Sequence, residues 1–308
     1  MSFRNDFVWG QATSAYQIEG AAFQDGKGWD IWDVFCKEEG KVFEGHSGDV
    51  ACDHYHRFRE DVALMKKMGV QGYRFSINWS RVFPNGTGTV NEKGLKFYHE
   101  LVDELCAANI EPYITLYHWE LPYELYKKGG WMNREIVEWF SDYAAFIAKE
   151  FSDKVTHFFT VNEPQCFIGL GYMTGVHAPG LKVPVRDTFL MAHHVLMAHG
   201  MAVKKMREAA KRDILIGIAP TGSMSYPDSE RPEDIEAARM HLMQVNPDLQ
   251  NWTWNVTWWS DPIFRGEYPE DGLKLYKDYL PTMTPEDMKL ISQPIDFYGQ
   301  NIYNGNRI

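Results

Sequence analysis

The chain has 308 residues, of which 44% are hydrophobic and 24% are charged, and its net charge is −11 at pH 7. This composition is that of an ordinary globular protein, and the negative charge argues against nucleic acids and anionic membrane surfaces as partners. No apolar run approaches the length of a membrane span, so no membrane association is expected.

The first residues, MSFRNDFVWG, contain no apolar segment behind a basic start, so we expect no signal peptide. The four cysteines lie far apart, without the paired spacing of a metal site or a disulfide framework: Cys36, Cys52, Cys106 and Cys166. Together these features predict reduced thiols in a cytoplasmic protein.

Short apolar or aromatic segments recur along the chain, and each ends in polar residues. They predict strands at 7–10, 73–79, 112–119, 157–164, 214–220 and 296–303. Because these runs are almost continuously apolar, they fit a parallel sheet that is covered on both faces.

Helical periodicity fills the intervals between the strands. It predicts helices at 56–69, 96–108, 134–151, 188–210 and 233–245, with a loop at 227–232. In the first of these, Phe58, Val62 and Met65 recur at helical spacing, and Gly69 lies where a C-terminal cap belongs.

Strand and helix alternate six times without a linker, which predicts one continuous α/β domain over residues 1–308. A doubly wound nucleotide-binding sheet would need a glycine-rich turn after an early strand, and none is present. A (β/α)8 TIM barrel collects its function at the carboxyl ends of the strands. Polar residues do lie at these ends, with Arg74 as an exception early in its strand: Gln17, Glu19, Asn78, His118, Asn162, Glu163, Asn301 and Tyr303.

Glu163 lies in the segment FFTVNEPQC, where apolar residues surround an Asn-Glu pair. A single carboxylate at a strand end most often forms a salt bridge. Here Pro164 ends the pairing of the strand, and Asn162 offers both a donor and an acceptor beside the carboxyl group. Apolar neighbours favour the neutral form of a carboxyl, which can donate a proton. The segment therefore predicts a general acid.

Several segments together resemble the β-glucosidase family, the first-numbered family of glycoside hydrolases. Besides TVNEP, which resembles the acid/base motif of the family, they are FVWGQATSAYQIEGA, GKGWDIWD, YRFSINWSRVFP, YITLYHWELP, WSDPIFRGEYP and DFYGQNIY. The resemblance runs the length of the chain and implies a (β/α)8 barrel that removes terminal β-D-glucosyl residues with retention. It implies no metal or organic cofactor.

The resemblance also implies the substrate and the roles of individual residues. The substrate would be a β-glucoside or a cello-oligosaccharide, as in cellulose degradation, while the choice among glucosides, galactosides and 6-phosphoglycosides stays open. Glu163 would be the acid/base, and Asn162 would bind the sugar 2-hydroxyl. The residues lining the first glucose subsite would be Gln17, His118 and Trp119, with Asn301 as a further substrate-binding residue. Arg74 and Tyr303 would contact the nucleophile and keep it ionised, because a nearby cation lowers the pKa of a carboxyl.

The second carboxylate of the mechanism is not recognisable in this sequence. Retaining hydrolysis needs two carboxylates about 5–5.5 Å apart, and in the family the second lies in a Thr-Glu-Asn-Gly context after the seventh strand. No glutamate after Glu163 has this context. We therefore expect a barrel truncated after about six βα units, inactive as an isolated chain. Its open edges would pair with a complementary chain or with further copies.

Alternatives to this interpretation stay open. Without a nucleophile, the chain could be a sugar-binding fragment that needs a complementary chain. Two histidine pairs could suggest a metalloenzyme, although the resemblance gives them no metal role: His54 with His56, and His193 with His194. Four tryptophans fit a core and a rim around the leaving group equally well: Trp252, Trp254, Trp258 and Trp259.

Overall fold

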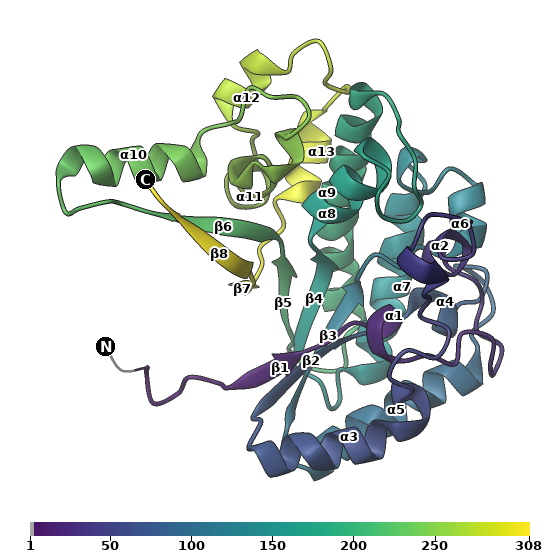
Figure 1. The fold of residues 1–308 in the computed structure, drawn as a ribbon. Helices are drawn as coiled ribbons and strands as arrows, with labels where there is room; N and C mark the ends of the chain where they lie inside the picture. The colour runs from purple at the N-terminus through teal and green to yellow at the C-terminus, as the bar shows by residue number, and fades with distance from the viewer. Residues whose placement is uncertain (1–2) are drawn as a thin grey trace.

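The computed structural model describes residues 3–308, and its centre is a parallel sheet of six strands (Figure 1). The strand order is β1 (Gly10–Ala12), β2 (Gly72–Ser76), β3 (Glu111–Tyr117), β4 (His157–Asn162), β5 (Leu215–Ala219) and β7 (Phe297–Tyr298). Spatial order thus follows chain order. A doubly wound sheet reverses its order at a switch point, whereas a barrel does not. The sheet therefore has the topology of a barrel.

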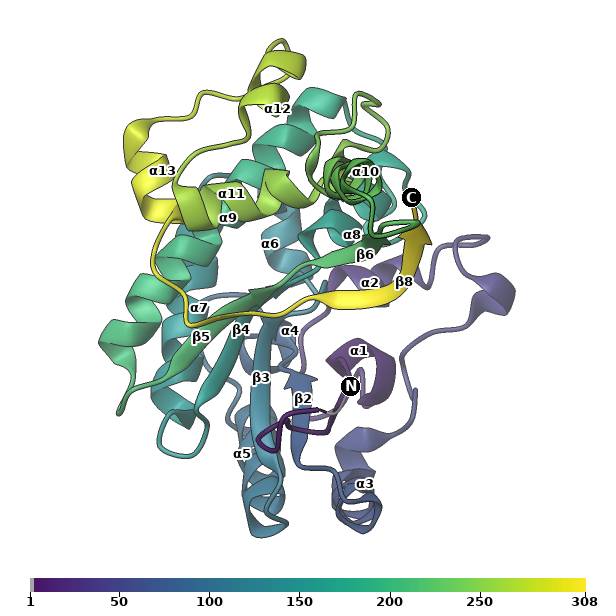
Figure 2. The ribbon, with the colours of Figure 1, turned by 90° about the vertical axis from the view of Figure 1, so that its left-hand side faces the viewer.

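Two further strands form a separate parallel pair that runs beyond the six-stranded sheet (Figure 2). They are β6 (Thr221–Tyr226), which follows β5 after Pro220, and β8 (Asn301–Arg307), which follows β7. The strand β6 was not predicted from the sequence, and β7 and the start of β8 were predicted as one strand. The reason is that the TGSMSY segment of β6 has small polar residues in place of an apolar run, so its strand conformation depends on pairing with β8.

The long helices flank the outer side of strands β2 to β5 (Figures 1 and 2). The helices are α1 (Ala15–Ile18), α2 (Ile31–Phe35), α3 (His54–Met68), α4 (Trp79–Val82), α5 (Glu92–Ala107), α6 (Tyr123–Lys127), α7 (Ile136–Phe151), α8 (Pro164–Ile168), α9 (Val185–Ala209), α10 (Pro232–Met243), α11 (Val256–Arg265), α12 (Glu270–Leu275) and α13 (Pro285–Ile291). Four short turns are η1 (Phe43–Gly45), η2 (Gly130–Met132), η3 (Gly169–Met173) and η4 (Trp252–Trp254).

The five helices predicted from periodicity are α3, α5, α7, α9 and α10, and all are confirmed with ends shifted by a few residues. The C-terminal cap of α3 is confirmed as well, because Gly69 has a φ of 76°, where a side chain would be strained. Most of the remaining helices are short and were not predicted. An isolated helix of one or two turns is unstable, so tertiary contacts must fix it.

The first predicted strand was wrong in its position. Segment 7–10 is almost entirely outside β1, and Phe7, Val8 and Trp9 are exposed by 42%, 48% and 55%. The rings of Phe7 and Trp9 pack against each other and against Phe3 in an exposed aromatic cluster. Their apolar character therefore indicated a surface cluster beside the edge of the sheet and not a buried strand.

A single hydrophobic cluster extends from Ile31 to Ile291 and holds the sheet and its helices together. Three of the four crowded tryptophans belong to it, since Trp252, Trp258 and Trp259 are buried and Trp252 stacks on Phe189 with 4.0 Å between ring centroids. Trp254 is 43% exposed. The core interpretation is correct for three of these residues only.

Within residues 3–308, β1 and β7 each have one neighbour in the sheet, so both edges are open as predicted. In the same part of the chain, no helix combines the length and the apolar character that crossing a bilayer requires.

Candidate active site

Glu163 lies at the carboxyl end of β4, as predicted, and its side chain is buried. Its φ of 48° and ψ of 63° are in the left-handed region, which costs a non-glycine residue free energy and is typical of functional sites. Pro164 begins α8 directly afterwards, where its missing amide hydrogen does no harm. The carboxylate Oε1 accepts a hydrogen bond of 2.7 Å from Asn301 Nδ2. The turn thus holds the carboxyl group at a fixed strand end.

Asn162 connects Glu163 to three other segments. Its Oδ1 accepts hydrogen bonds from Arg74 Nη2 at 2.6 Å and from Asn301 Nδ2 at 2.9 Å. Its Nδ2 lies 3.2 Å from His118 Nε2, and its backbone carbonyl accepts a hydrogen bond from Trp119 Nε1 at 3.1 Å. The structure therefore brings together six of the predicted residues, from the middle of β2, the carboxyl ends of β3 and β4, and the start of β8: Arg74, His118, Trp119, Asn162, Glu163 and Asn301.

His118 is held as a neutral imidazole. Burial, together with the charge of Arg74, lowers its pKa to about 3. The Asn162 amide donates to Nε2, because its oxygen is already occupied by Arg74 and Asn301. The ring proton is then on Nδ1, so His118 can offer one hydrogen-bond donor to a ligand.

Arg74 is a buried cation whose side-chain hydrogen bonds within residues 3–308 all go to neutral groups. Its Nε donates to Thr115 Oγ1 at 2.8 Å, and Nη1 donates to Asn301 Oδ1 at 3.2 Å. The guanidinium also lies over the ring of Phe159, 4.3 Å from its centroid. Burial lowers the pKa of Arg74 to about 10, although the charges of Glu163 and Tyr303 oppose this shift. The site is therefore electropositive beside Glu163.

Tyr303 is not brought into this hydrogen-bonded group. It is 84% exposed on β8 and lines a cavity of about 580 Å³ between β6, α10 and β8. Polar groups of that cavity bind one another, as in the 2.6 Å hydrogen bond from Ser223 Oγ to Asn304 Oδ1 and the 2.9 Å contact between Ser225 and His241. None of the residues lining this cavity has a buried side-chain polar atom without a hydrogen-bond partner in residues 3–308, so nothing here indicates a bound ligand.

A second cavity, of about 260 Å³, contains the predicted subsite residues. Gln17, His118 and Trp119 line it, and so do four residues that the sequence analysis did not single out: Ser14, Tyr16, Trp32 and His177. The ring of Trp32 stacks on that of Trp119 with centroids 6.5 Å apart, and His177 lies 5.5 Å from both rings. Trp119 has a φ of 86°, so this wall too includes a strained backbone position.

Three polar atoms of this cavity are buried without a hydrogen-bond partner in residues 3–308: Ser14 Oγ, His118 Nδ1 and His177 Nδ1. Buried polar groups are nearly always paired, so these three atoms are available to hydrogen-bond polar groups of a molecule in the cavity. Trp32 had a signal in the GKGWDIWD segment. Ser14 lies in the FVWGQATSAYQIEGA segment but was given no role, and His177 lies in none of the quoted segments; only the fold brings their loops together.

The histidine pairs that suggested a metal have other partners. His54 Nδ1 lies 2.6 Å from Asp61, and His56 lies 2.5 Å from Asp53. His193 Nδ1 lies 3.0 Å from the Tyr268 hydroxyl, and His194 Nδ1 donates to a backbone carbonyl at 2.8 Å. Across the described part of the chain, no three His, Cys, Asp or Glu side chains are arranged to hold a metal ion. The four cysteines are free thiols.

Comparison with known proteins gives a consistent set of relatives. The sequence model of "Glycosyl hydrolase family 1" matches residues 1–308. The chain is 48% identical to Beta-glucosidase A of Acetivibrio thermocellus, over 100% of this chain and 66% of that protein. It is 46% identical to a 1,4-beta-D-glucan glucohydrolase of Thermotoga neapolitana, over 99% of this chain and 69% of that protein.

A solved structure shows the same similarity in three dimensions. The beta-glucosidase from Thermotoga maritima in complex with glucoimidazole superposes with a TM-score of 0.88 at 44% identity, over 99% of this chain and 67% of that one. The present chain thus spans about two thirds of the length of the relatives that it matches.

Proposed function

The chain belongs to glycosyl hydrolase family 1, and from this membership we propose that it carries the acid/base half of a retaining β-glucosidase site within one domain, residues 1–308. Its six parallel strands with outer helices are part of a (β/α)8 barrel, as the sequence predicted. The observation that carries the proposal is the group of Glu163, Asn162 and Arg74 beside a cavity with three unpaired buried polar atoms.

In the proposed mechanism, the Glu163 carboxyl donates its proton to the glycosidic oxygen as the bond to the anomeric carbon breaks. A second carboxylate attacks that carbon from the opposite face and forms a glycosyl ester. Glu163, now ionised, then takes a proton from the water that hydrolyses the ester. Asn162 would bind the 2-hydroxyl, and Asn301 keeps the carboxyl group oriented through its hydrogen bond to Oε1.

The second carboxylate is expected beside Arg74. The largely buried guanidinium has no carboxylate among its hydrogen-bond acceptors and feels the charge of Glu163 only without direct contact, so a second carboxylate bound to it would offset the cost of its burial. Tyr303 would join this carboxylate once β8 has a neighbour on its open side. Within residues 3–308, Glu163 is the only carboxylate hydrogen-bonded to the side chains of Arg74, Asn162 and Asn301.

The substrate that we propose is a β-glucoside or a cello-oligosaccharide. The 260 Å³ cavity combines tryptophan rings, on which the C–H face of a pyranose can stack, with amide, imidazole and hydroxyl groups for its hydroxyls. Its lining residues are uncharged at neutral pH, since burial lowers the pKa of both His118 and His177. A neutral sugar therefore fits the cavity better than a charged one.

We propose further that the two open edges of the sheet pair with additional strands, on the same polypeptide or on a separate one. Parallel sheets rarely leave edges uncovered. The exposed aromatic cluster of Phe3, Phe7 and Trp9 beside β1 provides apolar surface for such a contact.

The test is hydrolysis of an aryl β-glucoside by the 308-residue polypeptide, with and without a polypeptide that carries the seventh and eighth βα units of a relative. We expect turnover in the mixture only. Turnover of about 1–10³ s⁻¹ by the 308 residues alone would show that a nucleophile is present among them and would overturn the half-site proposal. Binding of glucoimidazole without hydrolysis in any mixture would favour the alternative, a sugar-binding fragment.

A further inference from the structure

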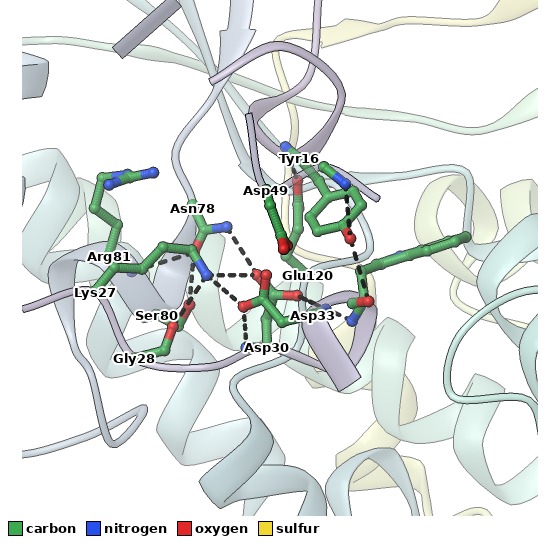
Figure 3. Close-up of polar contacts among 12 residues, drawn as sticks. Tyr16, Lys27, Gly28, Asp30, Asp33, Asp49, Asn78, Ser80, Arg81 and Glu120 are labelled. Carbon is green, nitrogen blue, oxygen red and sulfur yellow. Dashed lines mark hydrogen bonds and ion pairs between the residues drawn. The ribbon is translucent and has the colours of Figure 1, made fainter. Parts of the chain in front are cut away.

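A buried ionic cluster lies behind the wall of the 260 Å³ cavity and takes no part in the proposed chemistry (Figure 3). At its centre, Lys27 Nζ donates to Asp33 Oδ2 at 2.6 Å, to Asp30 Oδ2 at 3.1 Å and to the Gly28 carbonyl at 3.0 Å. The Lys27 side chain is 3% exposed, and both aspartates are fully buried. Burial of a lysine has a large desolvation cost, which the two aspartates offset here.

The cluster fixes the start of α2. Asp30 Oδ1 accepts hydrogen bonds from the amides of Trp32 at 2.9 Å and Asp33 at 3.1 Å, and Asp33 Oδ2 accepts one from the Asp30 amide at 2.9 Å. This is a complete capping box. Because α2 has only five residues, it is not stable alone, and the cap with its lysine adds to the packing of the buried Ile31 and Phe35 in holding it in place.

The same cluster ties α2 to two strand ends. Asp30 Oδ2 accepts a hydrogen bond of 3.0 Å from Asn78 Nδ2, which follows β2. Around Asp30, the Ile31 amide donates to the Leu121 carbonyl at 3.0 Å, and the Tyr123 amide donates to the Trp29 carbonyl at 2.8 Å. These backbone bonds join α2 to the segment just after Trp119. The wall that carries Trp32 and the wall that carries Trp119 are therefore fastened together at this point.

Lys27 is the cation that balances this group. Burial lowers the pKa of Lys27, but the charges of Asp30 and Asp33 outweigh burial, and its pKa is raised. Burial, with the charge of Asp30, raises the pKa of Asp33 to about 6 and raises that of the nearby Glu120 well above its usual value. The other buried cation of the region, Arg81, is bound to Glu19 at 2.9 Å. Without Lys27, the two aspartates would be buried with no cation of their own.

We propose that Lys27 is a positioning residue for sugar binding, which acts through α2 to hold the ring of Trp32 against Trp119 at the cavity wall. The identity of the ligand rests on the proposed function, whereas the placement of Trp32 does not. The two parts can therefore be tested separately.

The first test needs no ligand. The indole Nε1–H resonance of Trp32 is identified by its absence from the spectrum of Trp32→Phe. In Lys27→Met, we expect this resonance to shift or broaden while that of the core residue Trp252 stays in place. Lys27→Arg should keep both resonances near their original positions. An unchanged Trp32 resonance in Lys27→Met would overturn the proposal.

The second test is titration of the 308-residue chain with glucoimidazole. We expect Lys27→Met to weaken binding by about tenfold, the scale of a lost aromatic contact. In a Trp32→Ala background the same change should have little further effect, because Lys27 acts through Trp32. Independent effects that multiply would contradict this mechanism. If the unmodified chain does not bind glucoimidazole, the proposed sugar site of the isolated chain fails, and the resonance of Trp32 still decides the role of Lys27.

Two controls separate positioning from general stability. Lys154→Met removes a lysine whose ion pair with Asp103 is on the surface, and it should leave affinity unchanged. Ile147→Val trims the buried face of α7 and should lower the melting temperature without changing affinity. If Lys27→Met does not fold, Lys27→Met/Asp33→Asn removes one uncompensated carboxylate and carries both tests.

Discussion

Polar residues follow the apolar runs of β3 and β4, and polar residues at the start of β8 likewise follow the apolar run of β7, yet their environments differ. His118, Asn162 and Glu163 are joined by hydrogen bonds, and each of their strands has a neighbour on both sides. On β8, Asn301 reaches this group, while Tyr303, two residues further on, is 84% exposed. Similar sequence motifs therefore place polar side chains after a strand, but the surroundings of such a side chain are complete only where its strand has neighbours on both sides.

The largest effect is expected at the enclosed end of β4. Glu163→Gln should fold normally but lower hydrolysis of an unactivated disaccharide by about 10²–10⁴-fold in a form with a complete barrel, because the amide cannot donate the proton. Substrates with very good leaving groups should be affected less in the glycosylation step. Glu267→Gln changes an exposed carboxylate and serves as the control. Undiminished hydrolysis by Glu163→Gln would remove this residue from catalysis.

A smaller effect is expected at the cavity wall. His118→Ala should weaken glucoimidazole binding by about 1–3 kcal/mol, since it removes a donor from a buried pocket and leaves a sugar hydroxyl unpaired. Gln17→Ala should weaken it less, because the Gln17 side chain is exposed. Calorimetric titration of both variants checks the order. A larger loss for Gln17 would place the sugar nearer to α1 than we propose.

Acid should destabilise the enclosed region through two buried histidines. Burial lowers the pKa of His199 to about 3, and burial with the charge of Arg74 lowers that of His118 to about 3. Between pH 6.5 and 3 the unfolded chain then binds more protons than the folded one, so stability falls as the pH falls through this window. Urea unfolding at several pH values measures the slope, which should be shallower in His199→Gln. An unchanged slope would show that His199 titrates normally.

The smallest effect is expected at the exposed Tyr303, near the start of β8. Tyr303→Phe should change the stability of the 308-residue chain by less than about 0.5 kcal/mol, as for surface substitutions in general. The same change should lower turnover once a strand covers β8, because its hydroxyl would then reach the nucleophile. Denaturant melts of the chain alone and rate assays of the complemented form compare the two situations. A large loss of stability in the chain alone would mean that Tyr303 is already packed.

The sequence was most informative where local pattern and burial agree. Strands β2 to β5 were found because they are continuous apolar runs, and Glu163 and Asn162 because they interrupt one. The position of β1 and the existence of β6 could not be found, since Gly10–Ala12 and Thr221–Tyr226 become strands only by pairing with distant segments. The shared cavity of Ser14, Trp32 and His177 could not be predicted either, because only the folded chain brings these distant segments together. Lys27 lies in the GKGWDIWD segment, but the proposed role depends on its burial, which one sequence does not reveal.

The hydrogen bond from Asn301 to Glu163 determines which oxygen of the carboxyl group can transfer a proton. The amide occupies Oε1, so a proton on this carboxyl group is directed to Oε2. In the proposed cycle the proton would leave from Oε2 to the departing oxygen and return to Oε2 from the incoming water. The departing oxygen and the incoming water must then both lie beside Oε2 of Glu163. Water can therefore enter only after the leaving group has moved away, and it enters by the same route.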